Sequence, residues 1–143
     1  METRRAFLFP MHLSPTTAQR LARGRELFNS GLYFEAHEVW EDAWREETGL
    51  VRRTLHGLIQ VAAGFHKATR QKQPVGCVRL LEKGLEKLRD VPDGACGLAL
   101  GEFRRAVEEA LSQAALWQAG ERTGLDDRSS FRLETADGRA GRG

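Results

Sequence analysis

The stretch that decides the fold is residues 31–44, which read GLYFEAHEVWEDAW. At about 100° per residue, its apolar side chains fall on one arc of a helical wheel and its polar side chains occupy the rest. His37 and then Glu41 lie at the edge of that arc, one helical turn apart. The stretch therefore predicts an amphipathic helix over residues 32–47 that carries ionisable groups beside its buried face.

Helical patterns continue on both sides of this stretch. Residues 14–28 begin with Ser-Pro, the sequence of an N-cap followed by proline at the first helical position. Residues 51–69 are apolar nearly all round in their middle, as expected of a helix buried among others. Two amphipathic patterns follow, one starting near residue 74 and one over residues 100–117. Convincing strand alternation is absent, so we predict an all-α, single-domain antiparallel helical bundle of about five helices.

Two glycines of the central helix predict close helix packing. Gly57 and Gly64 lie seven residues apart, which places them on one side of the helix. Their missing side chains allow another helix to approach closely, at a cost in intrinsic helix stability.

The chain is expected to divide into an N-terminal arm (residues 1–13), the helical bundle (14–118) and a flexible C-terminal tail (119–143). Gly, Asp, Arg, Ser and Thr dominate the tail, and its few apolar side chains bury too little surface to offset the entropy of ordering it. An alternative for this segment is that Phe131 and Leu133 dock on the bundle as a short strand or arm.

The length, net charge and cysteine content of the chain exclude several classes of protein. A chain of 143 residues suits one domain, and a net charge of +2 gives no strong field, so neither nucleic acid nor a membrane is an expected partner. No apolar segment approaches the roughly 20 residues that span a bilayer. Two cysteines far apart, outside any CxxC pair, suit a reducing compartment. Because the first residues lack the pattern of a signal peptide, we expect a cytoplasmic protein.

A candidate site is predicted where the helices of residues 32–47 and 51–69 cross. His66 lies in the middle of the apolar stripe of the second of these helices, with His56 and Gln60 in a row beside it. We expect the imidazoles of His37 and His66 to point toward one spot shared with the carboxylate of Glu41. These three groups would form a metal site with an open position for water, as hydrolytic zinc sites require.

On this hypothesis Glu38 is the general base of a hydrolase whose cofactor is a divalent metal such as zinc. The helix differs from the zincin motif HExxH, because Glu41 stands where the second histidine belongs. The structural alternative is that His37, Glu41, Gln60 and His66 satisfy one another by hydrogen bonds, since a buried polar group without a partner costs about 1 to 3 kcal/mol.

Two tryptophans and further acidic groups surround this candidate site. Trp40 and Trp44 line it, one turn apart, and are expected to anchor the core rather than to form a ligand-binding box. His56 is expected at the surface, partly exposed. Glu41 is placed to form an i,i+4 ion pair with Arg45.

The residues just described carry a family resemblance. Residues 31–44, 57–66 and 76–81 together resemble the small all-helical bacterial and archaeal family called domain of unknown function 309, sometimes labelled predicted metal-dependent hydrolases. The resemblance spans roughly residues 20–90, and His56 departs from it because glutamine is expected there. It implies a helical bundle with a polar cluster at His37, Glu38, Glu41, Gln60 and His66.

Two functional hypotheses follow. The first is a metal-assisted hydrolase acting through the polar cluster. The second is a module that binds a protein partner or forms a homo-oligomer, suggested because residues 31–43 resemble one tetratricopeptide unit, although nothing recurs at 34 residues. The sequence contains no nucleophile motif, glycine-rich phosphate loop or cofactor fingerprint, which argues against kinases, dinucleotide enzymes and familiar serine hydrolases.

Overall fold

The structure is a computed structural model that describes residues 12–138. Within them, five α-helices and two short 3-10 helices follow one another in the order α2 (Pro15–Asn29), α3 (Tyr33–Glu46), α4 (Gly49–Thr69), α5 (Pro74–Leu88), η1 (Ala95–Gly97), α6 (Leu100–Gln118) and η2 (Arg128–Ser130). Among these residues, β-type pairing is limited to one isolated antiparallel bridge, between Leu98 and Thr135. The predicted all-α fold is confirmed, with helix bounds within a few residues of those expected.

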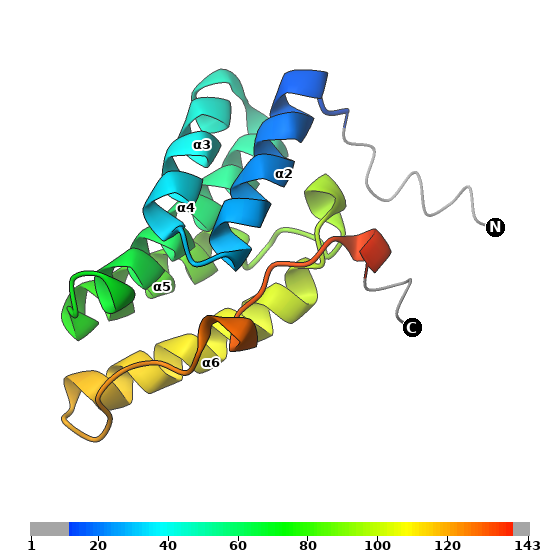
Figure 1. Cartoon of the computed structure of the whole chain (residues 1–143). Coiled ribbons are helices and arrows are strands. Elements are labelled where there is room, and N and C mark those ends of the chain that lie inside the picture. The colour runs from blue at the N-terminus through cyan, green and yellow to red at the C-terminus, as the bar shows by residue number, and fades with distance from the viewer. Residues whose placement is uncertain (1–11, 139–143) are drawn as a thin grey trace.

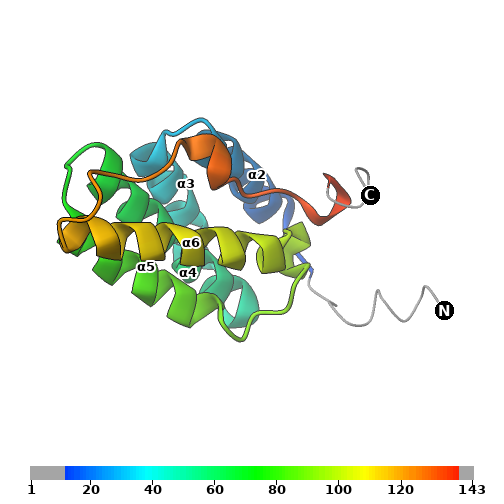
Figure 2. The same ribbon diagram turned by 90° about the horizontal axis from the view of Figure 1, so that it is seen from below.

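The helices pack mainly against their neighbours in sequence, α2 against α3, α3 against α4, α4 against α5 and α5 against α6. Figure 1 shows α2, α3 and α4 side by side, with α6 crossing beneath them. Seen from below, the segment that follows α6 runs back along that helix toward α2 (Figure 2). No helix between residues 12 and 138 combines the length and the apolar character needed to cross a membrane.

The ends of α2 and α3 show why the first helical hairpin forms. The Ser14 side chain accepts a hydrogen bond from the Thr17 amide at 3.1 Å, and Pro15 occupies the first helical position, as the sequence predicts. After α2, Gly31 adopts a φ of 83°, a left-handed conformation that glycine enters without steric cost. This turn sends α3 back along α2.

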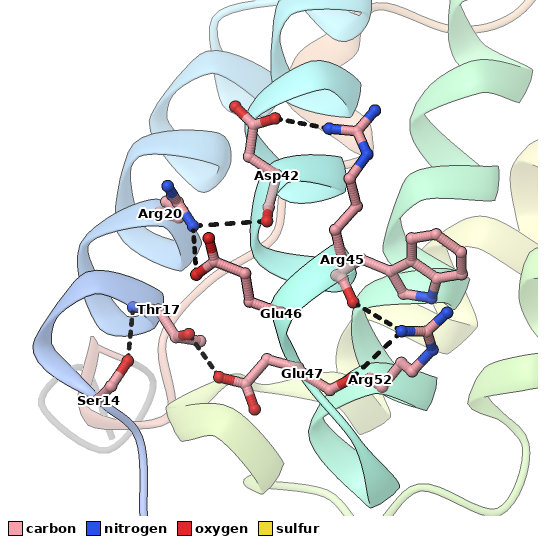
Figure 3. Close-up of polar contacts among 9 residues, drawn as sticks. Ser14, Thr17, Arg20, Asp42, Arg45, Glu46, Glu47 and Arg52 are labelled. Carbon is pink, nitrogen blue, oxygen red and sulfur yellow. Dashed lines mark hydrogen bonds and ion pairs between the residues drawn. The ribbon is translucent and has the colours of Figure 1, made fainter.

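At the other end of this hairpin, polar contacts join the start of α2 to the end of α3 and to α4 (Figure 3). Arg20 of α2 donates to the Glu46 carboxylate of α3 at 3.1 Å, and the Thr17 hydroxyl donates to Glu47. Arg52 of α4 donates to the backbone oxygens of Trp44 and Glu47 at the end of α3. These contacts hold α2, α3 and α4 in register.

An aromatic cluster forms the centre of the core. The ring of Phe28 lies 5.1 Å from Tyr33, 5.6 Å from Phe65 and 5.6 Å from Phe103, measured between ring centroids. Trp40 is fully buried and donates its indole N–H to the Leu21 carbonyl at 3.4 Å. Trp40 is therefore the core anchor that the sequence predicts.

The segment after α6 corrects one prediction. Residues 119–138, which we call the C-terminal arm, pack on the bundle, and Phe131 and Leu133 are only 2% and 0% exposed. The Asn29 side chain accepts from the Leu133 amide and donates to its carbonyl, both at 2.9 Å. The expectation of a flexible tail from residue 119 is thus wrong for this part, and the alternative that Phe131 and Leu133 dock on the bundle is correct. The two apolar side chains are buried, and Asn29 satisfies the backbone of Leu133. Residues 139–143, and residues 1–11 of the predicted N-terminal arm, lie outside the described residues.

Candidate functional site

The two histidines expected to share a metal ion both pack against Phe34. The centroid of the Phe34 ring lies 5.9 Å from that of His37 and 5.4 Å from that of His66. The Nδ1 atom of His37 and the Oε1 atom of Gln60 are buried, and neither has a hydrogen-bond partner among the residues described. The expected network of hydrogen bonds between these side chains is therefore not what the structure shows.

The carboxylates of the predicted site turn away from the histidines. Glu41 lies 3.4 Å from the Arg45 guanidinium, which confirms the predicted i,i+4 ion pair, and Glu38 is exposed. Between residues 12 and 138, no three His, Cys, Asp or Glu side chains are placed to hold a metal ion. The predicted ligands His37, Glu41 and His66 are thus not assembled, because Glu41 pairs within its own helix, and these residues do not fit a divalent metal.

His56 and Trp44 form a separate contact between α3 and α4. Their ring centroids lie 5.6 Å apart, and the guanidinium carbon of Arg52 lies 3.9 Å from the centre of the Trp44 ring. Burial, followed by the positive charges of Lys87, Arg52 and Arg53, lowers the pKa of His56 below its ordinary value of 6.5. His56 is partly exposed, as predicted, and belongs to this cationic patch rather than to a metal site.

Neither cysteine is an activated nucleophile. Burial raises the pKa of Cys77 to about 12 and that of Cys96 to about 11, although a hydrogen bond to Thr54 acts in the opposite direction at Cys96. Both side chains are therefore neutral thiols at pH 7.

A cavity of about 870 Å³ lies beneath the C-terminal arm, and we call it the arm pocket. It is bounded by the turn between α2 and α3, the end of α4, the end of α6 and the arm itself. Its lining residues are Ser30, Gly31, Leu32, Tyr33, Phe65, Ala68, Thr69, Arg70, Lys72, Trp117, Arg122, Thr123, Gly124, Leu125, Asp126, Asp127, Arg128 and Phe131. The cavity thus combines aromatic walls with charged groups, which is the usual composition of a small-molecule site.

The charges around the arm pocket are mostly positive. Four basic side chains and two acidic ones line it. Arg122 pairs with Asp126 at 3.1 Å. Arg70, Lys72 and Arg128 form no ion pair or side-chain hydrogen bond with any residue from 12 to 138. These three residues are exposed, so solvent screens their charges.

Tyr33 is the buried polar residue of the arm pocket. It is only 4% exposed, and its ring stacks on Phe65 with centroids 5.2 Å apart. Burial raises the pKa of Tyr33 to about 12, while the charges of Arg128 and Asp127, which both line the pocket, also act on its hydroxyl. That hydroxyl is a neutral donor available to a molecule in the pocket.

Sequence reasoning missed this site. On the helical wheel of residues 31–44, Tyr33 falls on the apolar arc, and Arg122 and Arg128 fall in the segment expected to be flexible. The signal that pointed toward the pocket was the pair Phe131 and Leu133, two large apolar side chains in an otherwise polar segment.

Comparison with known proteins agrees with the sequence resemblance. An uncharacterized protein of Aquifex aeolicus is 29% identical to this chain over 98 residues, which cover 66% of this chain and 28% of the relative. The chain thus spans less than a third of the length of that relative. Residues 21–80, from α2 into α5, match the family model described as Domain of unknown function (DUF309), whereas α6 and the C-terminal arm lie outside the match. Residues 21–80 are therefore similar to the DUF309 family, as the motifs of the sequence indicated.

Proposed function

We propose that this protein binds a small organic molecule in the arm pocket. The observation that carries the proposal is the arm pocket itself, which is lined by Tyr33 and Trp117 together with charged side chains. The Tyr33 hydroxyl at its wall can donate a hydrogen bond to an acceptor on the ligand. The cavity volume of about 870 Å³ lies within the range of small-molecule sites.

The walls of the pocket specify the body of the ligand. The apolar lining comes from three parts of the chain: Phe65 of α4, Trp117 of α6, and Leu125 and Phe131 of the arm. Phe65 and Phe131 are only 1% and 2% exposed, so most of the accessible apolar surface belongs to Trp117 and Leu125. A flat apolar group fits such walls, because aromatic side chains gain both from burial and from stacking. The ligand we propose therefore has an apolar body and a polar group that reaches Tyr33.

Metal-assisted hydrolysis, with His37, Glu41 and His66 as ligands and Glu38 as base, has less support. Those residues do not form a metal-binding group in the structure. Protein binding or self-association stays a prediction that light scattering can test. The large exposed apolar side chains come from four different helices and from Leu32, which precedes α3, and do not by themselves identify a partner.

The proposal is tested by titrating the full chain with N-phenyl-1-naphthylamine, a neutral probe whose emission rises in apolar surroundings. We expect saturable binding to the unaltered protein. Leu125→Glu places a charge in the apolar wall and should weaken binding by about tenfold or more. The matched control is Leu116→Glu, because Leu116 is 42% exposed on α6 and does not line the pocket.

Circular dichroism spectra and thermal melts establish that both variants are folded before they are compared. Absence of saturable binding to the unaltered chain would show that the arm pocket is not a small-molecule site. Equal loss of binding in the two glutamate variants would also overturn the proposal, because the probe would then be bound elsewhere.

A further inference from the structure

The C-terminal arm contains a stretch that contacts the bundle in the way a bound peptide contacts its receptor. Residues 131–135 are not helical, and their first three side chains alternate, with Phe131 and Leu133 buried and Arg132 exposed. Such alternation is typical of an extended chain that lies on a surface. The stretch ends in the antiparallel bridge to Leu98. Main-chain hydrogen bonds and buried alternate side chains are the two features by which proteins bind extended peptides.

The polar groups that hold this stretch contact its backbone. The Asn29 side chain accepts from the Leu133 amide and donates to the Leu133 carbonyl, both at 2.9 Å. Arg25, one turn earlier on α2, donates to the same carbonyl at 3.2 Å. The Ala99 amide donates to the Glu134 carbonyl at 2.9 Å. Because each of these bonds ends on the main chain, another extended segment can form them whatever its side chains are.

Two apolar side chains select the segment that fits. The rings of Phe131 and Phe65 lie 5.4 Å apart between centroids, and Phe131 is only 2% exposed. Leu133, two positions later, is fully buried in the core. A matching segment therefore carries an aromatic residue and, two positions later, a leucine.

An acidic residue after the leucine adds charge complementarity. The Glu134 carboxylate lies 3.9 Å from the guanidinium of Arg25 and 2.8 Å from that of Arg132, which belongs to the arm itself. The side chains of Arg25 and Glu134 are both less than one quarter exposed, so solvent screens this pair only in part. Arg25 thus favours an acidic residue directly after the leucine.

The surface that receives the arm and the arm itself come from different parts of the chain. We call Arg25, Asn29, Phe65 and Ala99 the arm seat. The first three lie within residues 21–80, which match the family model, whereas the whole arm lies outside that match. The similarity to the family therefore covers most of the arm seat and none of its occupant.

A short tether holds the arm on its seat. Residues 119–130 join α6 to the stretch and are mostly exposed, with Gln113 of α6 bound to Asp126. A tether of this length keeps its end at an effective concentration on the order of millimolar. Any other segment that binds the arm seat therefore has to compete with the arm.

We propose that the arm seat is a docking site for an extended segment of another protein, with the pattern aromatic residue, any residue, leucine, acidic residue. The C-terminal arm is the built-in competitor, which covers the seat until such a segment displaces it. The proposal is independent of the proposed function, because it does not require that the arm pocket bind a small molecule.

The test uses the full-length protein and a fluorescein-labelled synthetic peptide with the sequence of residues 126–138, and it measures fluorescence anisotropy. Leu133→Ala weakens the tethered arm and leaves the residues of the arm seat unchanged. We expect saturable binding to Leu133→Ala and at least about tenfold weaker binding to the unaltered protein, in which the intact arm competes. The matched control is Leu116→Ala, because Leu116 is 42% exposed on α6, and it should behave like the unaltered protein.

Modified peptides check that the peptide binds as the arm does. N-methylation at Leu133 removes the hydrogen that is donated to Asn29 and should weaken binding by about tenfold or more. N-methylation at Arg132 is the control, since that amide has no partner in the described part of the chain, and it should have little effect. A peptide that keeps only Phe131, Leu133 and Glu134, with serine elsewhere, should bind within about threefold of the parent peptide.

Peptide that binds neither protein with saturation, or both equally, would overturn the proposal. Equal effects of the two N-methyl groups, or no binding of the serine peptide, would overturn it as well. A dimer of the unaltered protein in light scattering that Leu133→Ala abolishes would assign the seat to the arm of a second copy, against the proposal.

Hydrogen exchange in the unaltered protein decides the matter if Leu133→Ala does not fold. Excess peptide labelled with heavy isotopes should accelerate exchange at the chain's own Leu133 amide, because the displaced arm loses its bond to Asn29. Exchange that is unchanged by the peptide would show that the arm is not displaced, and the proposal would fail.

Discussion

Tyr33 is the residue on which the candidate site depends, because it serves the core and the pocket at once. Its ring packs between Phe28 and Phe65 in the aromatic cluster, and the residue also lines the arm pocket. His37, one turn further along α3, packs beside Phe34 and buries its Nδ1 atom without a partner among the described residues. Of these two residues of α3, only Tyr33 lines the arm pocket.

At the same scale, His56 makes stability depend on pH. Because burial and nearby cations lower its pKa below 6.5, the folded protein binds a proton at His56 less readily than the unfolded chain does. This group leaves stability unaffected well above pH 6.5 and reduces it as pH falls through 6.5 toward the folded pKa. When the pH is lowered from about 7.5 to about 5.5, we therefore expect the free energy of unfolding to fall less in His56→Gln than in the unaltered protein.

Thermal melts at the two pH values measure this difference. The control is His12→Gln, because His12 is exposed at the start of the described chain, and it should behave like the unaltered protein. Parallel losses in the unaltered chain and in His56→Gln would contradict the assignment.

At the scale of the elements, α4 and α5 form the tightest helix pair. A Cβ atom on Gly57 would lie 2.6 Å from Cγ of Leu88, and one on Gly64 would lie 2.8 Å from Cδ2 of Leu81. The close approach predicted from the spacing of these two glycines is confirmed. The facing helix contributes its own glycine, Gly84, at the same interface.

Gly84→Ala is expected to destabilise the protein by about 1 to 3 kcal/mol, because the added methyl group overpacks the interface. It would lie 2.6 Å from Cγ2 of Val61 and 3.0 Å from the backbone oxygen of Gly57. The matched control on the same helix is Gly76→Ala, whose Cβ would meet only the flexible side chain of Lys67 and which should gain helix propensity of up to about 1 kcal/mol. Urea denaturation of both variants measures the two effects, and a Gly84→Ala protein as stable as the control would refute the packing argument.

At the scale of the whole molecule, the C-terminal arm joins parts of the chain that are distant in sequence. The buried Gln113 of α6 donates to the Asp126 carboxylate and accepts from the Asp126 amide, both at 2.9 Å. Asn29 of α2 holds Leu133 in the same two-sided way. Between these two sets of hydrogen bonds, Phe131 of the arm lines the arm pocket.

Leu133→Ala should destabilise the protein by about 2 to 4 kcal/mol, because Leu133 is fully buried and its loss leaves a cavity beneath the arm. Amide hydrogen exchange in residues 126–134 should accelerate in this variant as the arm opens more often. Arg132→Ala is the control, because Arg132 is exposed and its ion pair with Glu134 at 2.8 Å contributes little. If both variants exchange at the same rate, the arm does not depend on the buried leucine.

The sequence by itself determined the helices and their order. The periodicity of residues 31–44, the Ser-Pro start of α2 and the apolar run of α4 are local features, and hydrogen bonds within a helix join residues only four apart. For the same reason the ion pair between Glu41 and Arg45, four residues apart, was predictable. The spacing of Gly57 and Gly64 likewise placed both glycines on one side of α4, the side that packs closely on α5. The family resemblance over residues 21–80 rests on these motifs too.

Only the tertiary structure decided where the arm lies and what the candidate site is. Asn29 and Leu133 are 104 positions apart, and no local pattern shows that the side chain of one satisfies the backbone of the other. The arm pocket likewise draws on residues from α3, α4, α6 and the arm, so it exists only once these pack together. Conversely, His37, Glu41 and His66 fit a metal site by spacing alone, but Glu41 turned to the nearer Arg45. Spacing restricts which side chains can meet, whereas packing and competing partners select those that do.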